Sequence, residues 1–193
     1  MTAASPLYPT LSQVLLPAGF LQSHCQWLLP LAASGLLTLA AKLQIPFWPV
    51  PMTLQTFAVL VIAMGLGSRL GMAAVVLYLA QGAAGLPVFA GGGGLGYLTG
   101  PTGGYLVGFV AAAGLMGWLA ERGFDRSTPC TLLAMTLGTA LIFVPGLVWL
   151  SAFVGWHRVL EVGLWPFLPA EGAKILLAAA LLPGLWHWLG RRS

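Results

Sequence analysis

Two of the chain's few charged side chains stand close together near its C-terminal end. Glu171 and Lys174 lie three residues apart in LPAEGAKILLAAALLP, residues 168–183, and at that spacing they occupy neighbouring positions on one helical face. An ionised side chain costs roughly 2.5–3.5 kcal/mol at the centre of a membrane helix and much less near the surface. The two can simply pair at the surface. They can also form a site, in which Lys174 binds a carboxylate as a point charge and Glu171, near a helix N-terminus, accepts N–H donors.

Aromatic side chains gather around three other segments, and they would cover the apolar part of a ligand held by this pair. The segments are 45–52, 86–104 and 156–169, and the aromatic residues in and beside them are Phe47, Trp48, Phe89, Tyr97, Tyr105, Trp165 and Phe167. Each of these residues alone is more often part of the aromatic belt at a membrane surface. Together with the charged pair they favour a small amphiphilic anion as the ligand.

Patterns typical of catalysis or metal binding do not occur in the sequence. His24, His157 and His187 have no metal-ligand spacing, and there is no Ser-His-Asp set or HExxH motif. Cys25 and Cys130 are too far apart in sequence for a metal-type spacing. We therefore predict that the protein is not an enzyme and has no catalytic residue, metal site or cofactor.

The composition predicts the elements that must position these residues. Of the 193 residues 59% are hydrophobic and 6% are charged, whereas a soluble domain has about 25% charged residues. We expect one all-α integral membrane domain over residues 1–193. In such a chain the net charge of +4 reports topology and gives no reason to expect a nucleic-acid partner.

Six membrane-spanning helices are predicted, at 27–43, 53–66, 72–85, 104–120, 131–154 and 170–189. A spanning helix needs about 20 apolar residues, so the second segment is short and a count of five remains an alternative. The prolines of 45–52 end the first span, and the glycines and Arg69 of 65–71 separate the second from the third. The polar stretch ERGFDRSTP, residues 121–129, is expected in water.

Six spans place both termini on the same side of the membrane. With the termini in the cytoplasm, five basic residues lie inside and three lie toward the outside; the five are Arg69, Arg122, Arg126, Arg191 and Arg192, and the three are Lys42, Arg158 and Lys174. This excess favours cytoplasmic termini. No Lys or Arg precedes Lys42, so we expect no basic region of a cleaved signal peptide. The three aromatic segments then share the outer face and predict a pocket that opens outward.

The segment 86–104, here called the glycine-rich segment, has eight glycines among its residues 91–104. The spacing Gly91-x-Gly93-x-x-Gly96 fits a dinucleotide-binding loop, but no strand precedes it and no acidic residue follows at about 20 residues, so we treat that match as coincidental. A loose surface loop is one interpretation. Because the glycines alternate with apolar residues, we prefer a wall or lid packed over a ligand site.

The first predicted helix is thin on more than one side because of its small residues. They include Ala32, Ala33, Ala40 and Ala41. Small residues allow close approach between membrane helices. They predict either ordinary packing inside the bundle or a face on which a partner protein docks.

Four runs of residues together resemble the BioY family, the biotin-binding S components of energy-coupling-factor (ECF) vitamin transporters. They are VPMTLQT (50–56), GLPVFAGGGG (85–94), GPTGGYLVGF (100–109) and PAEGAK (169–174), in the expected order within residues 28–190. The resemblance implies a six-helix S-component bundle with ordered extracellular loops. It also implies an outward-facing biotin site that is capped by the first and third of these loops.

The resemblance also implies residues of the site. The last-helix motif of the family resembles Pro-Gly-Asp-x-x-Lys, so Lys174 is kept, Glu171 replaces the aspartate and Ala170 replaces the glycine. The valerate carboxylate of biotin would bind Lys174, and the ureido group would bind Glu171. Further polar candidates are Tyr78, Gln81, Gln55 and Tyr105.

The implied partners are a transmembrane coupling protein and a pair of ABC-type ATPases, in a prokaryotic cytoplasmic membrane. Whether the chain transports without them, as a homo-oligomer, stays open. Two other functions also stay open: an S component for another vitamin, and a membrane scaffold without a ligand.

Overall fold

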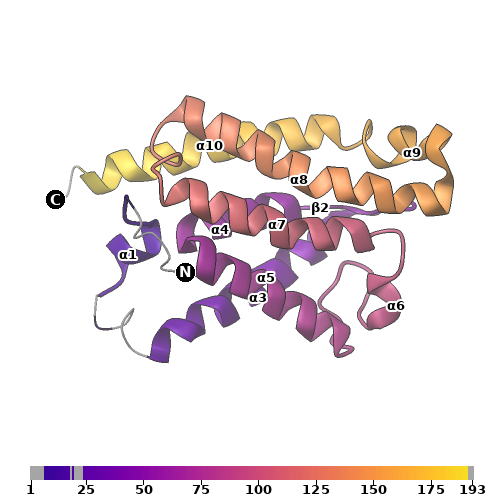
Figure 1. The fold of residues 1–193 in the computed structure, drawn as a ribbon, viewed down its shortest axis with the longest axis horizontal. Helices are drawn as coiled ribbons and strands as arrows, with labels where there is room; N and C mark the ends of the chain where they lie inside the picture. Colours follow the sequence, from indigo (N-terminus) through magenta and orange to yellow (C-terminus); the bar gives the residue numbers. More distant parts are fainter. Residues whose placement is uncertain (1–6, 18, 20–23, 191–193) are drawn as a thin grey trace.

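The computed structural model describes residues 7–17, 19 and 24–190, and within them it is predominantly helical (Figure 1). The helices are α1 (Leu11–Leu15), η1 (His24–Trp27), α3 (Leu28–Lys42), α4 (Gln55–Leu66), α5 (Ser68–Ala83), α6 (Leu95–Leu98), α7 (Gly103–Ala120), α8 (Thr128–Val154), α9 (Trp156–Gly163) and α10 (Leu168–Gly190). Two short strands, β1 (Gln44–Ile45) and β2 (Met52–Thr53), form an antiparallel hairpin.

Helix α7 is the central helix of the bundle. It packs against α4, α5 and α8, while α10 packs on α8 and α4, and α3 packs on α5. Two-thirds of α7 is buried, compared with about one-third of α8 and less of α10. Outer helices expose rows of leucine and valine, as expected for helices whose outer face contacts lipid.

Three helices are long and apolar enough to cross a membrane by themselves, namely α7, α8 and α10. Helices α3 and α4 are apolar but have only 15 and 12 residues. A span usually needs about 20 residues. The part of the chain that the structure describes therefore gives direct support for three of the six predicted spans.

The connection between α4 and α5 is shorter than the sequence suggested. Only Gly67 separates the two helices, whereas the sequence predicted a break over 65–71 and a third span beginning at 72. Gly67 has φ 85°, a conformation that favours glycine and turns the chain sharply. Arg69 lies in the first turn of α5.

The two ends of the bundle carry different structures (Figure 1). At one end, here called the loop end, lie the β-hairpin, helix α6 within the glycine-rich segment, and α9. At the other, the terminal end, lie α1, residues 121–127 and the C-terminal part of α10. Helix α9 runs along the outside of this loop end, with Trp156 exposed and Val159 buried.

The terminal end corrects one expectation. The stretch 121–129 was expected in water as a whole, but Asp125 within it is fully buried. Its Oδ2 accepts a hydrogen bond of 2.6 Å from Trp186 Nε1 of α10. The Arg126 guanidinium lies over the rings of Trp186 and Tyr8, 4.2 Å and 4.7 Å from their centroids. Packing by the N-terminal segment and α10 therefore removes this carboxyl group from solvent.

Candidate ligand-binding site

A partly enclosed hollow of ≈ 480 Å³, including the part open to solvent, lies at the loop end. Its walls come from the hairpin and its connection, the glycine-rich segment, α4, α7, α8, and the start of α10. The lining residues are Val50, Pro51, Thr53, Gln55, Thr56, Ala90, Tyr97, Thr102, Tyr105, Leu106, Phe109, Phe143, Phe167 and Glu171. All three aromatic segments singled out in the sequence contribute, so the prediction that they meet around a pocket is confirmed.

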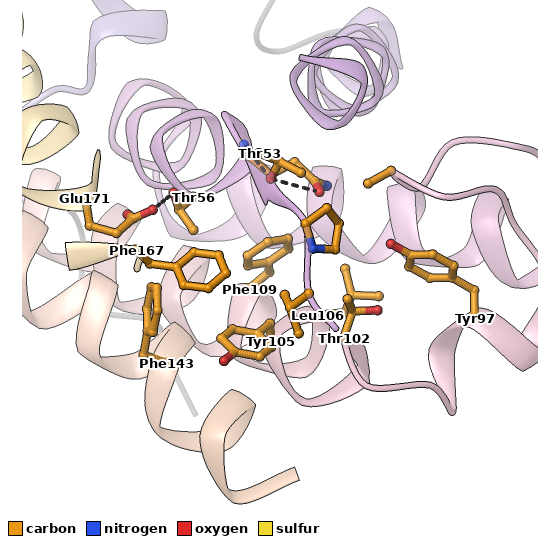
Figure 2. Close-up of a pocket in the computed structure, with 14 residues that line it drawn as sticks. Thr53, Thr56, Tyr97, Thr102, Tyr105, Leu106, Phe109, Phe143, Phe167 and Glu171 are labelled. Atoms are coloured by element: carbon orange, nitrogen blue, oxygen red, sulfur yellow. Dashed lines mark hydrogen bonds between the residues drawn. The ribbon is translucent and has the colours of Figure 1, made fainter. Parts of the chain in front are cut away.

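Most of the hollow is apolar, and its charged group stands on one side. Figure 2 shows Glu171 and Thr56 on that side, Tyr97 and Thr102 on the opposite side, and aromatic rings between them. Phe143 packs edge-on against both Phe167 and Tyr105, with ring centroids 5.9 Å and 5.5 Å apart. Edge-to-face aromatic packing of this kind gives this part of the hollow a fixed shape.

Glu171 and Lys174 form an ion pair, with 2.7 Å between Lys174 Nζ and Glu171 Oε1. Glu171 is buried and lines the hollow. The Lys174 ammonium also donates to the carbonyl oxygen of Thr53 at 2.7 Å and to Thr56 Oγ1 at 2.9 Å. These three bonds use all three donors of an ammonium group.

Thr56 joins the two charged groups. Its hydroxyl donates to Glu171 Oε1 at 2.9 Å and accepts from Lys174 Nζ. The first turn of α4 carries Thr56, and β2 carries Thr53, so two elements more than 110 residues away in sequence hold the pair of α10 in place. Because the pair is neutral as a unit and its donors are bonded, its burial costs far less than that of an isolated charge.

Gln55 and Tyr78, two of the predicted polar residues, bond to each other. Gln55 lines the hollow, and its Nε2 donates to the Tyr78 hydroxyl at 2.7 Å. The Tyr78 hydroxyl donates in turn to the carbonyl oxygen of Val88 at 3.2 Å. Tyr78 is fully buried behind the hollow. Through its bond to Val88, Tyr78 therefore holds the glycine-rich segment against α5.

Phe89 anchors the glycine-rich segment. Its buried ring lies 5.4 Å from the ring of Tyr78, edge-on, and is stacked on Tyr97 at 5.0 Å. The ring sits directly over Gly82 of α5, where an added Cβ would lie 1.9 Å from a ring carbon. Only glycine leaves room for this ring. The segment thus packs as a wall of the hollow through Ala90 and Tyr97.

Tyr105 has a double role at the hollow. Its ring is part of the lining, and its hydroxyl donates to the carbonyl oxygen of Gly163 at 3.0 Å. That bond ties α7 to the end of α9. Tyr105 therefore holds the third aromatic segment against the other two.

Several predicted residues lie away from the hollow. Trp48 is 79% exposed at the tip of the hairpin connection. Gln81 is half-buried on α5 and is not part of the lining. Of the four alanines predicted as a docking face, Ala33, Ala40 and Ala41 are buried inside the bundle, and Ala32 is exposed on α3. Small residues on α3 thus serve mainly the internal packing.

The structure adds lining residues that the sequence analysis did not single out. Thr53 and Thr56 belong to the run VPMTLQT, whose hydroxyl groups were the available signal. Phe109 and Phe143 lie inside α7 and α8, where an apolar ring gives no indication in sequence of whether it faces lipid or a cavity.

Comparisons with known proteins find relatives that are named as biotin transporters. A probable biotin transporter BioY from Pyrococcus horikoshii is 35% identical over 148 residues, which is 76% of this chain and 87% of that protein. The biotin transporter BioY of Thermotoga maritima is 39% identical over 150 residues, 77% of this chain and 88% of that protein. These relatives are named as transporters and not as enzymes.

The fold has a close counterpart among solved structures. The crystal structure of the S-component for biotin from an ECF-type ABC transporter matches with a TM-score of 0.73 over 86% of this chain and 95% of that chain, at 24% identity. At that identity the match speaks for the fold. The sequence model of the BioY family matches residues 21–191. With this match over most of its length and relatives above 30% identity, the chain is a membrane protein that belongs to the BioY family.

Proposed function

We propose that this protein captures biotin at the loop end of the bundle and serves as the biotin-binding subunit of a vitamin uptake system. The observation that carries the proposal is the hollow itself: an aromatic cavity with one buried carboxylate, Glu171, neutralised by Lys174. The names of the BioY relatives agree with this ligand.

The chemistry of biotin matches the two sides of the hollow. Its ureido group offers two N–H donors and a carbonyl acceptor, its thiophane ring is apolar, and its valerate chain ends in a carboxylate. Glu171 can accept hydrogen bonds from the ureido N–H groups, because a carboxylate is a stronger acceptor than a neutral group. The rings of Phe109, Phe143 and Phe167 would cover the thiophane ring.

Two orientations of biotin are open, and they assign different roles to Lys174. In one, its ammonium binds the valerate carboxylate, as predicted from the sequence. In the other, the ureido group binds Glu171, and Lys174 pairs with the Glu171 carboxylate instead of the ligand. The contacts support the second, because Glu171 lines the hollow while the three donors of Lys174 are bonded to Glu171, Thr53 and Thr56.

Calorimetric titration of detergent-solubilised protein tests the function and the orientation together. We expect biotin to bind tightly and Glu171→Gln to weaken binding roughly ten- to hundredfold, the scale of a hydrogen bond to a charged group. The matched control is Glu161→Gln on the exposed face of α9.

Biotinol, which lacks the carboxylate, separates the two orientations of the ligand. If Lys174 binds the carboxylate, biotinol binds weakly to the wild type and Lys174→Met costs biotin more than biotinol.

Three outcomes would contradict parts of the proposal. Stronger binding of a different vitamin in competition would make the chain an S component for that vitamin. Absence of any bound small molecule, with partner binding retained, would favour a scaffold. Equal affinity of Glu171→Gln and wild type would remove Glu171 from the site.

We further propose that the chain spans a prokaryotic cytoplasmic membrane six times, with the loop end outside and both termini in the cytoplasm. Its partners would be a transmembrane coupling protein and a pair of ABC-type ATPases. Support comes from the fold shared with an S-component of an ECF-type ABC transporter. Transport without these partners, as a homo-oligomer, is the alternative.

The exposed face of α3 around Ala32 is the proposed docking face for the coupling protein. Ala32→Trp should lower co-purification of the coupling protein and the ATPases from cells that express all components, because close helix approach needs small residues. Ala180→Trp, at an exposed alanine of α10, is the control. Equal recovery with both variants would move the docking face elsewhere.

A further inference from the structure

Two side chains at the start of the hairpin reach across to the glycine-rich segment. Lys42, in the last turn of α3, donates from Nζ to the carbonyl oxygen of Phe89 at 2.7 Å. Gln44, in β1, donates from Nε2 to the carbonyl oxygen of Ala90 at 3.2 Å. The sequence analysis used Lys42 only as a marker of topology. In the structure it is one half of a clamp on two consecutive carbonyl groups.

The two clamped residues belong to the wall of the hollow. Ala90 is part of the lining. Phe89 is fully buried, and its ring is stacked on Tyr97, which lines the hollow from the opposite side to Glu171. The position of this backbone therefore decides how closely the wall approaches a bound ligand.

The clamp is also linked to the charged pair of the hollow. In the hairpin, Gln44 pairs with Thr53, and the amide of Leu54 donates to the carbonyl of Leu43 at 3.0 Å. The carbonyl oxygen of Thr53 accepts from Lys174. The backbone of the hairpin therefore connects Thr53, which binds Lys174, to Gln44, which binds the glycine-rich wall.

A second hollow marks where the wall and the hairpin would separate. A more open groove of ≈ 710 Å³, solvent included, lies between the hairpin connection and the glycine-rich segment. Pro51, Tyr97 and Thr102 line both this groove and the ligand hollow. A ligand that leaves the hollow between the hairpin and residues 89–97 must move these two segments apart. Lys42 and Gln44 form hydrogen bonds across the same gap, to the carbonyl oxygens of Phe89 and Ala90.

We infer that Lys42 and Gln44 are positioning residues that hold the glycine-rich wall closed on the ligand and so slow its release. The inference rests on the proposed biotin site. Neither side chain lines the hollow near Glu171. Their loss should therefore raise the rate of dissociation and leave the polar contacts of the ligand in place.

The test combines a measurement without ligand and one with it. Lys42→Met removes the ammonium, Gln44→Leu removes the amide, and Lys42→Arg restores a donor. Arg158→Met, at an exposed cation of α9 on the same end, is the matched control. Hydrogen exchange of the amides of residues 86–98 is recorded in the ligand-free protein, and release of radiolabelled biotin is followed after dilution.

We expect exchange in residues 86–98 to be at least about threefold faster in Lys42→Met, and biotin to dissociate about tenfold faster, the scale of a lost hydrogen bond from a charged donor. Gln44→Leu should show a smaller change in the same direction, and Lys42→Arg should recover most of the wild-type values. Arg158→Met should match the wild type.

Each other outcome overturns a stated part. Unchanged exchange in both Lys42→Met and Gln44→Leu would overturn the clamp. Faster exchange with unchanged dissociation would overturn its role in ligand release. If the wild type binds no biotin, the proposed function fails, and the exchange measurement still decides whether the clamp holds the wall.

Discussion

At the scale of single residues, Thr56 organises the polar side of the hollow. It donates to Glu171 and accepts from Lys174, so one hydroxyl group fixes the positions of both charged side chains. An ion pair that is held by additional hydrogen bonds keeps its geometry when a ligand arrives. The residue belongs to a helix whose other polar side chain at the hollow, Gln55, bonds to Tyr78.

Thr56→Val keeps the shape of the side chain and removes its hydroxyl group. We expect biotin affinity to fall about five- to thirtyfold, which corresponds to roughly 1–2 kcal/mol for the disturbed bonds. Titration calorimetry measures it. Thr136→Val on α8 is the control, because that exposed hydroxyl bonds only within its own helix, to the carbonyl of Leu132. A loss of equal size in both variants would count against Thr56 as an organiser of the pair.

Asp125 predicts a dependence of stability on pH. Burial raises the pKa of its carboxyl group above the ordinary value, although the bond from Trp186 and the charge of Arg126 lower it in part. Because the folded-state pKa is the higher one, the unfolded chain loses this proton first as the pH rises. Folding stability therefore falls as the pH rises from the ordinary aspartate pKa through the raised one.

Asp125→Asn should remove this dependence, since an amide carries no charge and its oxygen can still accept from Trp186. We expect a higher apparent melting temperature than wild type near neutral pH, and a smaller change between acidic and neutral pH, measured by tryptophan fluorescence in detergent. A melting temperature that is lower than wild type at neutral pH would show that the ionised carboxylate is stabilising.

At the scale of elements, the glycine-rich segment behaves as a packed wall whose position depends on α5. The ring of Phe89 fills the space above Gly82, and the Tyr78 hydroxyl bonds to the carbonyl of Val88. Contacts from α5, from Lys42 at the end of α3 and from Gln44 in β1 thus fix this stretch. Close packing also accounts for a glycine within the segment, because a Cβ added at Gly93 would overlap the carbonyl oxygen of Leu86.

Gly82→Ala would place a methyl group within the ring of Phe89. The ring must then move, so we expect the wall to shift and biotin affinity to fall by at least about tenfold, with a lower apparent melting temperature. Gly96→Ala is the matched control, because a Cβ there meets nothing within 4 Å. Binding and melting are measured on both. Wild-type binding in Gly82→Ala would mean that Phe89 is not needed to position the wall.

At the scale of the whole molecule, basic residues stand at both ends of the bundle. Within the part of the chain that the structure describes, Arg69, Arg122 and Arg126 lie toward the terminal end, and Lys42, Arg158 and Lys174 lie at the loop end. Arginine and lysine are retained preferentially on the cytoplasmic side. The sequence adds Arg191 and Arg192 directly after α10, and the resulting five basic residues against three favour the terminal end as the cytoplasmic one.

Single cysteines test this orientation. In a background without Cys25 and Cys130, Trp165→Cys at the loop end should react with a membrane-impermeant maleimide in intact cells, and Arg122→Cys should react only after the membrane is opened. The reverse pattern would invert the topology. Reaction of both residues in intact cells would contradict an arrangement in which these two connections lie on opposite sides.

The sequence by itself determined the features that are local along the chain. Composition established a membrane protein, and a spacing of three placed Glu171 and Lys174 on one helical face. The prolines, glycines and aromatic residues of 45–52, 86–104 and 156–169 marked the segments that build the hollow. These inferences succeed because composition, periodicity and helix-breaking residues act within a few neighbouring residues.

Only the tertiary structure decided which faces of the helices meet. The acceptors of Lys174 lie on β2 and α4, the rings of Phe109 and Phe143 turn toward the hollow, and Asp125 is buried under Trp186. In a chain that is apolar almost everywhere, hydrophobicity does not distinguish a side chain that faces lipid from one that faces the interior. Packing between elements that are far apart in sequence makes that choice, and the separation is 61 residues for Asp125 and Trp186 and 121 residues for Thr53 and Lys174.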